Sequence, residues 1–323
     1  MAASVTDFWK GFSKLERQDR LRKLIDLGVL EAEDVRFLQA GGLRDFDLAE
    51  KFIENVIGYF QLPLGVAVNF QIDGQDFVIP MAVEETSIIA AASKTAKWVR
   101  EHGKITTRSL GKLIVGQIQL AKVKDFARFE ATILENRLRL IDDANRDVAL
   151  GLVRRGGGVT DISVRRIERG DRQIMAVVHV LADPCDAMGA NVMNTVCEYL
   201  KQPIMDLSGE TGTMCILSYL VDSMLVEARV EIPAIEKDLG ERLAEASLFA
   251  KLDPYRAATN NKGVLNGIDP ILIATGNDWR AVEAGIHAYA ARDGQYRSIT
   301  DWKMECDCLV GVLVAPIVVG TVG

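Results

Sequence analysis

The sequence predicts an α/β protein of the α+β kind, in which a larger helix-and-sheet domain is interrupted by a smaller inserted domain. Three observations favour this class. The chain has 323 residues, more than the roughly 250 to 300 at which a single core stops growing. Its composition, 49% hydrophobic and 26% charged, is typical of a globular protein. From about residue 110 the expected elements follow the order β-α-β-β-α-β, which is ferredoxin-like.

Residues 1–109 are expected to form the first part of the larger domain. Ser13-Lys-Leu-Glu16 has the pattern of a helix-capping box, and Gly28 is placed to end that helix. Asp73-Gly74 is a strong hairpin signal between an alternating strand at 66–72 and a partner at 77–81. Further helices are expected at about 31–40, 45–57 and 86–101.

Residues 110–220 are expected to form the inserted domain. The glycines at 156–158 divide it into two halves. Strands are expected at 113–120, 159–168, 172–182 and 214–220, with helices at 126–144 and 190–201. The loop before the second helix is not G-x-G-x-x-G, so a Rossmann fold is not indicated.

Residues 221–323 are expected to rejoin the larger domain. A strand at 225–232 leads into an acidic amphipathic helix, then into glycine- and asparagine-rich segments where the chain is expected to turn. A helix is expected to start at Asp278. The final run, LVGVLVAPIVVGTVG, has strand character and no polar tail, so we expect further residues beyond Gly323.

Composition excludes several functional classes. The net charge of −7 argues against a broad nucleic-acid surface. No segment approaches the roughly 20 apolar residues of a membrane span, and the N-terminus has no signal-peptide pattern, so we expect a cytoplasmic protein. The five cysteines are interpreted as free thiols, and Cys306-x-Cys308 lacks a second ligand pair, so no metal site is predicted.

Lys262 is the first candidate for chemistry, because it has no adjacent acid. Its neighbours are amides and glycines: Asn260, Asn261, Gly263, Asn266 and Gly267. A preorganised cation at a developing oxyanion contributes roughly 3 to 4 kcal/mol to catalysis, against about 0 to 1 kcal/mol for an exposed ion pair. The alternative is a loop lysine that contacts only solvent.

Carboxylates supply further candidates, each with a simpler alternative. Glu84 and Glu85 follow a strand, so their side chains point to opposite faces and only one can enter a pocket. Both could instead be solvated acids near a helix start. Asp278 could tune Lys262 or only cap its own helix.

The segment Asp183–Asn191 joins a strand to a helix and contains Gly189. Free N–H groups at such a helix start can bind phosphate or other polar ligand groups, although the same sequence suits an ordinary cap and turn. The three histidines, His102, His179 and His287, are each interpreted as structural.

Five dispersed motifs together resemble class II hydroxymethylglutaryl-coenzyme A reductase, in the family's order and over nearly the whole chain. They are ENVIG (54–58), PMAVEETS (80–87), DAMGAN (186–191), DPYRAATNNK (253–262) and TGNDWRAVE (275–283). The resemblance implies reduction of hydroxymethylglutaryl-coenzyme A to mevalonate and coenzyme A by two hydride transfers, or the reverse oxidation.

The resemblance also implies roles for residues at matching positions. Glu85 would be the acid/base carboxylate, Lys262 the cation beside the reacting oxygen, and Asp278 the group that tunes them. Substrate or coenzyme A contacts would come from Glu54, Asn55, Ser87, Arg256 and Asn266, and cofactor contacts from Asp186, Met188, Gly189 and Asn191. Arginine suits a carboxylate because its fork is planar.

In the resembled family the inserted domain binds the nicotinamide cofactor without a Rossmann fold, and members are dimers or assemblies of dimers. We expect the same here. Asp147 could bond a ribose 2′-hydroxyl and repel a 2′-phosphate, which favours NADH. Arg146, Arg154 and Arg155 could do the opposite and accept NADPH.

Two departures from the family pattern stand out. The family's catalytic histidine lies in a C-terminal flap domain beyond the point where this sequence stops, and no histidine here matches it. Tyr219 stands where relatives usually carry an asparagine near the cofactor. The alternative function is therefore a non-catalytic ligand-binding or assembly protein on the same scaffold.

Overall fold

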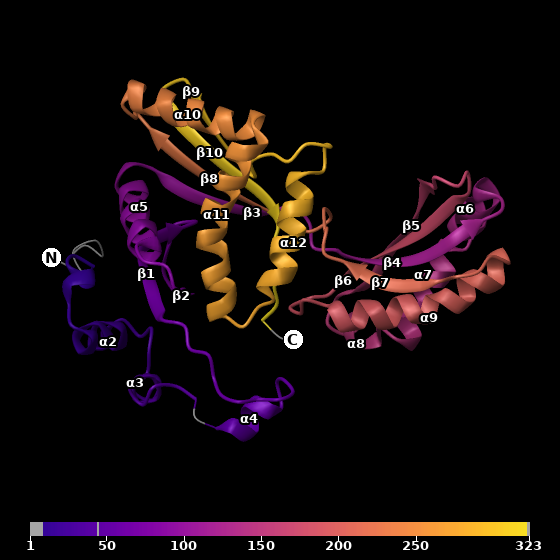
Figure 1. The fold of residues 1–323 in the computed structure, drawn as a ribbon, viewed down its shortest axis with the longest axis horizontal. Coiled ribbons are helices and arrows are strands. Elements are labelled where there is room, and N and C mark those ends of the chain that lie inside the picture. Colours follow the sequence, from indigo (N-terminus) through magenta and orange to yellow (C-terminus); the bar gives the residue numbers. More distant parts are fainter. Residues whose placement is uncertain (1–8, 44, 322–323) are drawn as a thin grey trace. The chain divides into compact units, whose positions relative to one another are not determined.

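A computed structural model describes residues 9–43 and 45–321. Residues 1–8 of the first predicted segment, and the end of the predicted C-terminal run at Gly323, lie outside the described residues. The fold is mixed α/β with two sheets (Figure 1). The chain forms two compact units: Met1–Ile105 with Asn266–Gly276, and Thr106–Leu265 with Asn277–Gly323.

The first unit opens with short helices: η1 Phe12–Lys14, α2 Arg17–Asp26 and α3 Ala32–Gln39. The predicted helices ending near Gly28 and at 31–40 are confirmed, and Gly28 adopts φ 69°. The capping box at Ser13 is wrong, because Ser13 lies in η1 and Glu16 precedes α2 without a side-chain cap. The aromatic pair Trp9 and Phe12 packs edge to face and fixes η1 instead.

The predicted helix at 45–57 is also wrong. Only α4, Phe46–Glu50, is helical, with Asp45 accepting hydrogen bonds from the N–H groups of Asp47 and Leu48. Helices as short as this gain most of their stability from a buried apolar face. Beyond Glu50 the large apolar side chains Phe52, Ile53 and Ile57 are exposed, so among the described residues they find no packing surface that would extend the helix.

The hairpin of the first unit is confirmed. Strands β1 Leu64–Ile72 and β2 Gln75–Ala82 pair antiparallel around Asp73 and Gly74, whose φ values of 51° and 78° suit the type I′ turn that Asp-Gly favours. Helix α5, Ile88–His102, packs on β1, and the Ser93 hydroxyl accepts from the N–H of Val68. An unexpected strand, β3 Lys104–Ser109, pairs parallel to β1 at Ile105.

A four-stranded antiparallel sheet occupies residues 114–218 of the second unit, in the order β5-β6-β4-β7. The strands are β4 Ile114–Val123, β5 Gly158–Glu168, β6 Ile174–Asp183 and β7 Met214–Ser218. The expected strands are therefore found in the expected order. The expected helix at 126–144 is divided at Asn136 into α6 Phe126–Glu135 and α7 Arg137–Asp147, followed by α8 Leu150–Val153.

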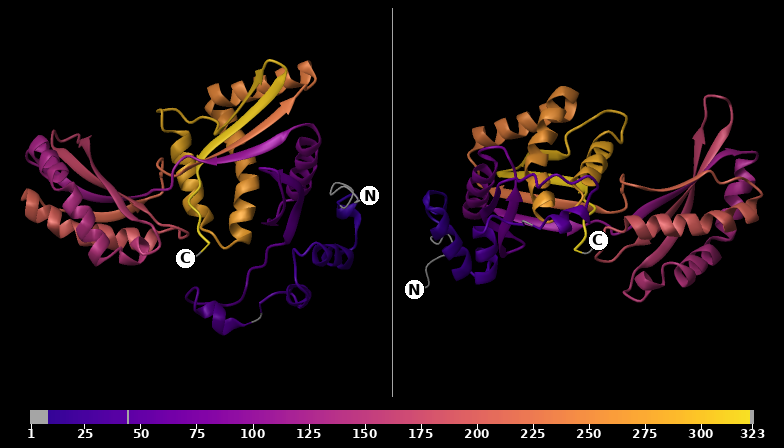
Figure 2. Two further views of the ribbon diagram at one scale, coloured as in Figure 1. Left: turned by 180° about the vertical axis from the view of Figure 1, so that it is seen from behind. Right: turned by 60° about the horizontal axis from the view of Figure 1, so that its bottom comes forward.

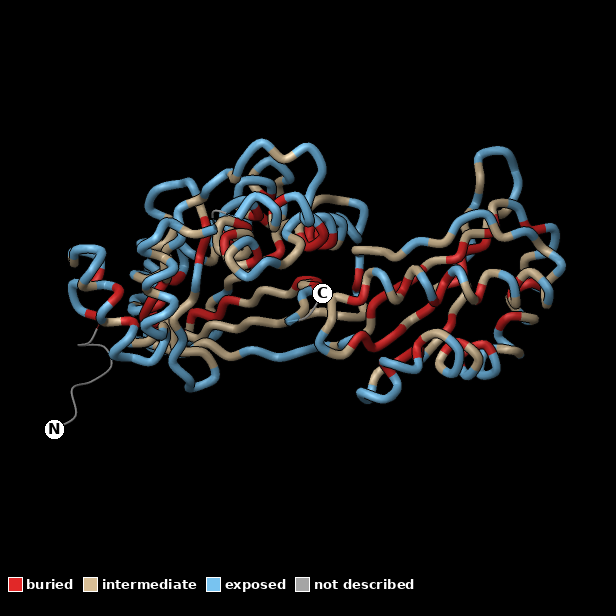
Figure 3. Tube along the Cα trace, turned by 90° about the horizontal axis from the view of Figure 1, so that it is seen from below, coloured by how far each residue is buried: buried red, intermediate tan, exposed pale blue. Residues whose placement is uncertain are grey.

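Helix α9, Ala190–Ser208, extends past the predicted end at 201 and contains Pro203. Helices α6, α7 and α9 cover one face of this sheet (Figure 2). Alternate residues of β4, including Ile118 and Leu120, face those helices and are fully buried. Figure 3 shows the buried positions following these strands and helices. The opposite face carries polar groups such as Gln117, whose side chain bonds His179.

The remaining elements of the second unit are β8 Leu225–Pro233, α10 Lys237–Leu252, α12 Trp279–Ala290, β9 Thr300–Glu305 and β10 Cys308–Pro316. Strand β10 pairs antiparallel with β8 and with β9, which confirms the strand character of the apolar run. Helix α11, Pro254–Ala274, begins in the second unit. Across residues 9–43 and 45–321, no helix has the length and apolar content to cross a bilayer.

Candidate functional site

Lys262 lies on helix α11, not in a turn. The expectation of a turning segment is wrong although two glycines and Pro270 fall inside the helix. Asp253 begins the helix by accepting a hydrogen bond from the N–H of Arg256 at 3.0 Å. Lys262 is exposed, whereas the preceding residue, Asn261, is fully buried. The helix therefore holds the lysine at a fixed position on its surface.

The amides beside Lys262 are structural anchors of α11. Asn261 donates to the carbonyl of Arg297 at 2.9 Å and accepts from the N–H of Ile299 at 3.1 Å. Asn260 donates to the hydroxyls of Ser298 at 2.7 Å and Thr300 at 3.1 Å. Since a helix of this length with internal glycines is weak by itself, these contacts fix its first half against the turn at 297–300.

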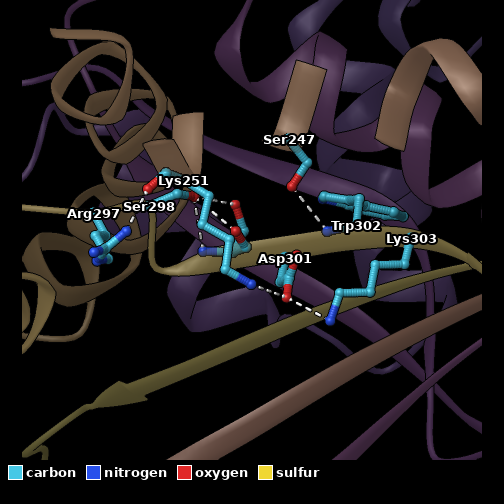
Figure 4. Close-up of polar contacts among 8 residues, drawn as sticks. Ser247, Lys251, Arg297, Ser298, Asp301, Trp302 and Lys303 are labelled. Carbon is cyan, nitrogen blue, oxygen red and sulfur yellow. Dashed lines mark hydrogen bonds and ion pairs between the residues drawn. The ribbon is translucent and has the colours of Figure 1, made fainter. Parts of the chain in front are cut away.

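That turn is itself held by charged side chains. Asp301 accepts from both Lys251 and Lys303 at 2.9 Å, and the guanidinium of Arg297 donates to the carbonyl of Lys251 at 3.1 Å (Figure 4). Burial raises the pKa of Asp301, but the two ammonium groups outweigh it and hold the pKa below its ordinary value. The carboxylate therefore stays ionised and joins α10 to β9.

Asp278 occupies the N-cap of α12, where its Oδ1 accepts from the N–H of Ala281 at 3.1 Å. Arg280 lies 3.5 Å from the same oxygen. The preceding side chain, Asn277, accepts from the N–H of Gly320 at 3.0 Å. The capping interpretation of Asp278 is therefore confirmed, and its second role as a partner of Lys262 stays a prediction.

Glu85 and Ser87 lie on the exposed segment between β2 and α5 in the first unit. Ser87 precedes α5 with φ 71° and makes no side-chain cap hydrogen bond. A positive φ is unfavourable for a residue with a Cβ, and such strain is often found at functional sites. The arrangement presents both side chains to the surroundings at the start of a helix of 15 residues.

Glu54 and Asn55 lie in the turn that follows α4, also in the first unit. Both are exposed, and Asn55 adopts φ 56°. Asn266, the remaining predicted substrate contact, lies on α11 four residues after Lys262, so the two side chains project from one face of that helix.

Asp147, the predicted ribose contact, ends α7 and is exposed. Arg146 donates to both of its oxygens at 2.7 and 2.8 Å, and the hydroxyl of Tyr199 donates to Oδ2. Hydrogen bonds from Arg146 and then Tyr199 hold the pKa of Asp147 below its ordinary value. Tyr199 was not a sequence candidate, since it lies 52 residues away on α9.

The 183–191 loop begins at a buried acid. Asp183 pairs with Lys112 and accepts from the N–H of Cys185 at 2.9 Å. Burial raises the pKa of Asp183, yet the hydrogen bonds from Lys112 and Cys185 outweigh it and leave the pKa lowered. Lys112 was also not a candidate, because nothing in its local sequence indicates a partner 71 residues further along. The pair fixes where the loop starts.

Gly189 ends the loop at the N-cap of α9 with φ 84°. A Cβ there would collide with Ile114 and Pro184, so the backbone can pass only as glycine. The other predicted cofactor contacts differ in exposure: Asp186 and Asn191 are exposed and Met188 is half-buried. Asp186 also accepts a hydrogen bond from the N–H of Thr321 through its carbonyl at 2.9 Å.

The three histidines have structural contacts. His102 lies 2.8 Å from the carbonyl of Trp98, His179 lies 3.0 Å from Gln117, and His287 lies 2.8 Å from the hydroxyl of Tyr296. Burial, reinforced by Arg165, lowers the pKa of His179. In the described part of the chain, no three acidic, histidine or cysteine side chains are grouped as a metal site.

The sequence profile described as "Hydroxymethylglutaryl-coenzyme A reductase" matches residues 15–323. A 3-hydroxy-3-methylglutaryl-coenzyme A reductase of Archaeoglobus fulgidus is 42% identical over 322 residues, which cover 97% of this chain and 72% of that protein. A probable enzyme of the same name from Borreliella burgdorferi is 29% identical, with 96% and 70% covered.

Solved structures of the Streptococcus pneumoniae 3-hydroxy-3-methylglutaryl-coenzyme A reductase are also similar. One matches with a TM-score of 0.92 and 38% identity, covering 98% of this chain and 76% of that one. A second, described as the class II enzyme bound to NADPH in open conformations, has the same score and identity and is covered to 87%.

Proposed function

The chain belongs to the hydroxymethylglutaryl-coenzyme A reductase family, and from that premise we propose how its residues divide the reaction. The family interconverts hydroxymethylglutaryl-coenzyme A with mevalonate and coenzyme A. Reduced nicotinamide, when bound, supplies one hydride per molecule, so two molecules in succession would take the thioester to the alcohol while coenzyme A leaves as its thiol. The observation that carries the proposal is an exposed lysine on a helix whose neighbouring amides are both anchored.

Lys262 stabilises negative charge on the substrate carbonyl oxygen during each reduction. Its support is the geometry of α11: Asn260 and Asn261 hold the backbone, so the ammonium group needs little reorganisation. A Cβ added at Gly263 or Gly267 would meet no atom within 4 Å. Each glycine inside a helix costs about 1 kcal/mol in stability relative to alanine. Because packing requires neither glycine, we interpret them as allowing a ligand to approach the helix backbone closely.

Glu85 and Asp278 are proposed to handle protons. Glu85 is the exposed carboxylate beside the strained Ser87 and would donate a proton to the reduced oxygen. Asp278 is held at the start of α12 by its cap and would favour the charged form of Lys262. The two hydrides are matched by two protons: one ends on the thiolate of coenzyme A, and the other, which Glu85 would supply, ends on the alcohol oxygen.

The remaining substrate contacts are proposed to position the thioester. Arg256, on the first turn of α11, would bind the free carboxylate through its planar fork, with Ser87 as a second donor. Asn266 would bond the same network as Lys262 from one face of the helix. Glu54 and Asn55 would contact the coenzyme A portion from their exposed turn.

Residues 110–220 are proposed to be a ferredoxin-like domain inserted between two parts, 1–109 and 221–323, of a larger substrate domain. The support is the element order β-α-β-β-α-β and the strand order β5-β6-β4-β7, which differs from a parallel Rossmann sheet. We propose that this insert holds the nicotinamide cofactor.

We propose that the loop at 183–191 contacts the dinucleotide. Gly189 brings its backbone against Ile114 and Pro184, where a side chain has no room, and opens α9, a 19-residue helix whose first N–H groups suit an anion. Asp186, Met188, Gly189 and Asn191 would contact the cofactor. These residues bind and orient it, and the reactive carbon–hydrogen bond belongs to the nicotinamide.

NADH is proposed as the preferred cofactor, with NADPH as the alternative. Asp147 is exposed and its pKa is lowered, so an ionised carboxylate would repel a 2′-phosphate. If Arg146 moved away from Asp147, its guanidinium would attract a 2′-phosphate and favour NADPH. The test is kcat/KM measured with NADH and with NADPH, and a higher value with NADPH overturns this part of the proposal. If the Asp147 carboxylate discriminates against the 2′-phosphate, Asp147→Asn should reduce the ratio of kcat/KM with NADH to that with NADPH.

A homodimer, or an assembly of dimers, is proposed as the working form. Residues 46–64 of the first unit expose apolar side chains that a lone chain leaves in water, including Phe52 at 71%, Ile57 at 103% and Phe60 at 90%. Contiguous exposed apolar surface is typical of interaction sites. Sedimentation equilibrium measures the mass of the assembly directly.

The catalytic roles are tested by two pairs of substitutions. Lys262→Ala should lower kcat by about 100- to 1000-fold with a small change in KM, since a preorganised charge is lost mainly in the transition state. Lys237→Ala, at a lysine whose side chain is 85% exposed on α10, is the control. NADH formed from mevalonate, coenzyme A and NAD is the readout, and an unchanged kcat contradicts the role.

Glu85→Gln should abolish turnover, whereas Glu84→Gln on the same exposed segment should retain it. Circular dichroism and sedimentation establish that both variants keep fold and assembly. Equal losses in the two variants would point to disruption of the segment. Full binding of cofactor and thioester without turnover in the unmodified protein would favour the alternative of a non-catalytic binding protein.

A further inference from the structure

A hollow lies at the other end of the four-stranded sheet from the 183–191 loop. It has a volume of about 700 Å³ and is bordered by three segments: 121–124, 172–174 and 209–213. The first follows a register shift in β4, the second is the β5–β6 turn, and the third joins α9 to β7. Helix α9 separates the two ends by about 28 Å, given its 19 residues.

The hollow is rich in positive charge although the chain as a whole carries −7. Its border contains three cations, Lys122, Lys124 and Arg172, against one carboxylate, Glu210. Glu210 is already engaged, since its Oε1 accepts from the backbone N–H of Lys124 at 3.0 Å. Among the described residues, the charged ends of these three side chains make no hydrogen bond or ion pair, although the charge of Lys122 acts on nearby Asp171.

Two other arginines of the β5–β6 hairpin have acidic partners. Arg166 pairs with Glu168 at 2.7 Å, and Arg169 pairs with Asp171 at 2.9 Å while also donating to the carbonyl of Ala121. The hairpin therefore contains acids for its structural arginines, and Arg172 is left to face the hollow. This selective pairing points to a ligand with negative charge.

The backbone at Arg172 supports the same conclusion. Arg172 has φ 66°, the left-handed region that turns normally fill with glycine or asparagine. The turn already contains a glycine, Gly170, at a different position. A non-glycine residue in this region is strained, and observed strain at a surface turn favours a functional interpretation of the side chain.

We propose that this hollow binds a small organic phosphate. Lys122, Lys124 and Arg172 would contact the phosphate oxygens by charge-assisted hydrogen bonds, with the hydroxyl of Thr211 as a further donor. Val123 and Ile174 supply apolar surface for the organic part, and the volume is within the roughly 300 to 1000 Å³ of small-molecule sites. The proposal does not depend on the reductase assignment.

Calorimetry with inorganic pyrophosphate tests the site, in the full chain and with saturating NADH so that phosphate contacts of the proposed cofactor site are occupied. One saturable site is expected. Arg172→Gly should weaken binding about 10- to 100-fold, as expected when a charged hydrogen-bond donor is lost. Its melting temperature should be equal or higher, since glycine adopts positive φ without strain.

Arg166→Gln is the matched control, because it removes an arginine from the same hairpin that already has a partner. It should bind pyrophosphate like the unmodified protein, and Lys124→Gln should bind more weakly. The proposal is overturned by the absence of saturable binding, by equal binding in Arg172→Gly, or by equal losses in Arg172→Gly and Arg166→Gln, which would indicate only general attraction of anions.

Discussion

The apolar side chains of residues 114–208 mostly lie in a core, whereas those of residues 46–64 mostly lie on the surface. In the first region Ile118, Leu120 and Ile133 are each 0% exposed, within one continuous core beneath α6, α7 and α9. In the second region Phe52, Ile57 and Phe60 are more than 70% exposed. The two regions contain the same residue types, so burial here is decided by what each segment can pack against.

The two regions therefore differ in how much of their apolar surface they bury with their own residues. The buried core of the proposed cofactor region comes mostly from its own strands and helices, with Val221 and Val318 contributed from beyond residue 220. Residues 46–64 leave large apolar side chains uncovered, which the proposed dimer would bury. Four substitutions test this contrast, and the one with the greatest expected change in stability comes first.

Ile118→Ala should give the largest effect, a loss of about 2 to 5 kcal/mol in the free energy of unfolding, because a fully buried side chain leaves a cavity. Urea unfolding followed by circular dichroism measures it. A loss below about 1 kcal/mol would show that the core beneath the sheet is not closed as described.

Asn261→Ala should come next, at about 1 to 3 kcal/mol, because the carbonyl of Arg297 and the N–H of Ile299 lose their partner in a buried setting. The kcat should fall further than stability alone explains, because the helix beside Lys262 is loosened. Asn260→Ala is the control: its partners are hydroxyls that can rotate to other acceptors or donors, so a smaller change is expected. Equal effects would contradict this ranking.

Asp183→Asn should lower stability by about 1 kcal/mol near neutral pH, through loss of the charge that Lys112 pairs with. The folded-state pKa of Asp183 is below its ordinary value, so its contribution is present above the unfolded pKa of about 3.9 and is lost as pH falls through the folded pKa. Melting temperatures of both proteins between neutral and acidic pH should therefore converge on acidification. A constant difference would rule out ionisation as the cause.

Ile57→Ser should give the smallest effect on folding, within about 0.5 kcal/mol, because the side chain is 103% exposed. Its effect should appear instead in assembly, as a weaker dimer by sedimentation equilibrium. A large loss of stability at concentrations where the chain is monomeric would show that residues 46–64 pack in a way the structure does not describe.

Local signals in the sequence predicted elements whose residues satisfy each other nearby. Asp73-Gly74 and the alternation around it sufficed for the first hairpin, and the pattern after residue 110 predicted the order of four strands. The prediction of a helix at 45–57 failed because its apolar side chains do not pack against any segment that the structure describes. Helix α11 was missed because glycine and proline signals are overridden by contacts of Asn260 and Asn261 with a turn about 36 to 40 residues later.

In the candidate site, too, the sequence predicted local contacts but not those between residues far apart in the chain. The cap at Asp278 and the glycine at 189 follow from local rules and were predicted. The bond between Tyr199 and Asp147, and the pair of Lys112 with Asp183, join residues 52 and 71 positions apart. No periodicity or spacing contains that information, because it depends on how the strands between them are paired.

Gly189 has a consequence for experiments that read importance from tolerance to mutation. Any side chain at this position would be strained by the positive φ and would collide with Ile114 and Pro184. A saturation library would therefore report glycine as invariant even if nothing ever bound there. Asn191, two residues on and exposed, has no such internal constraint, so the spectrum of residues accepted there would report on the ligand. Failure of Gly189 to accept other residues therefore says less about function than the set of residues that position 191 accepts.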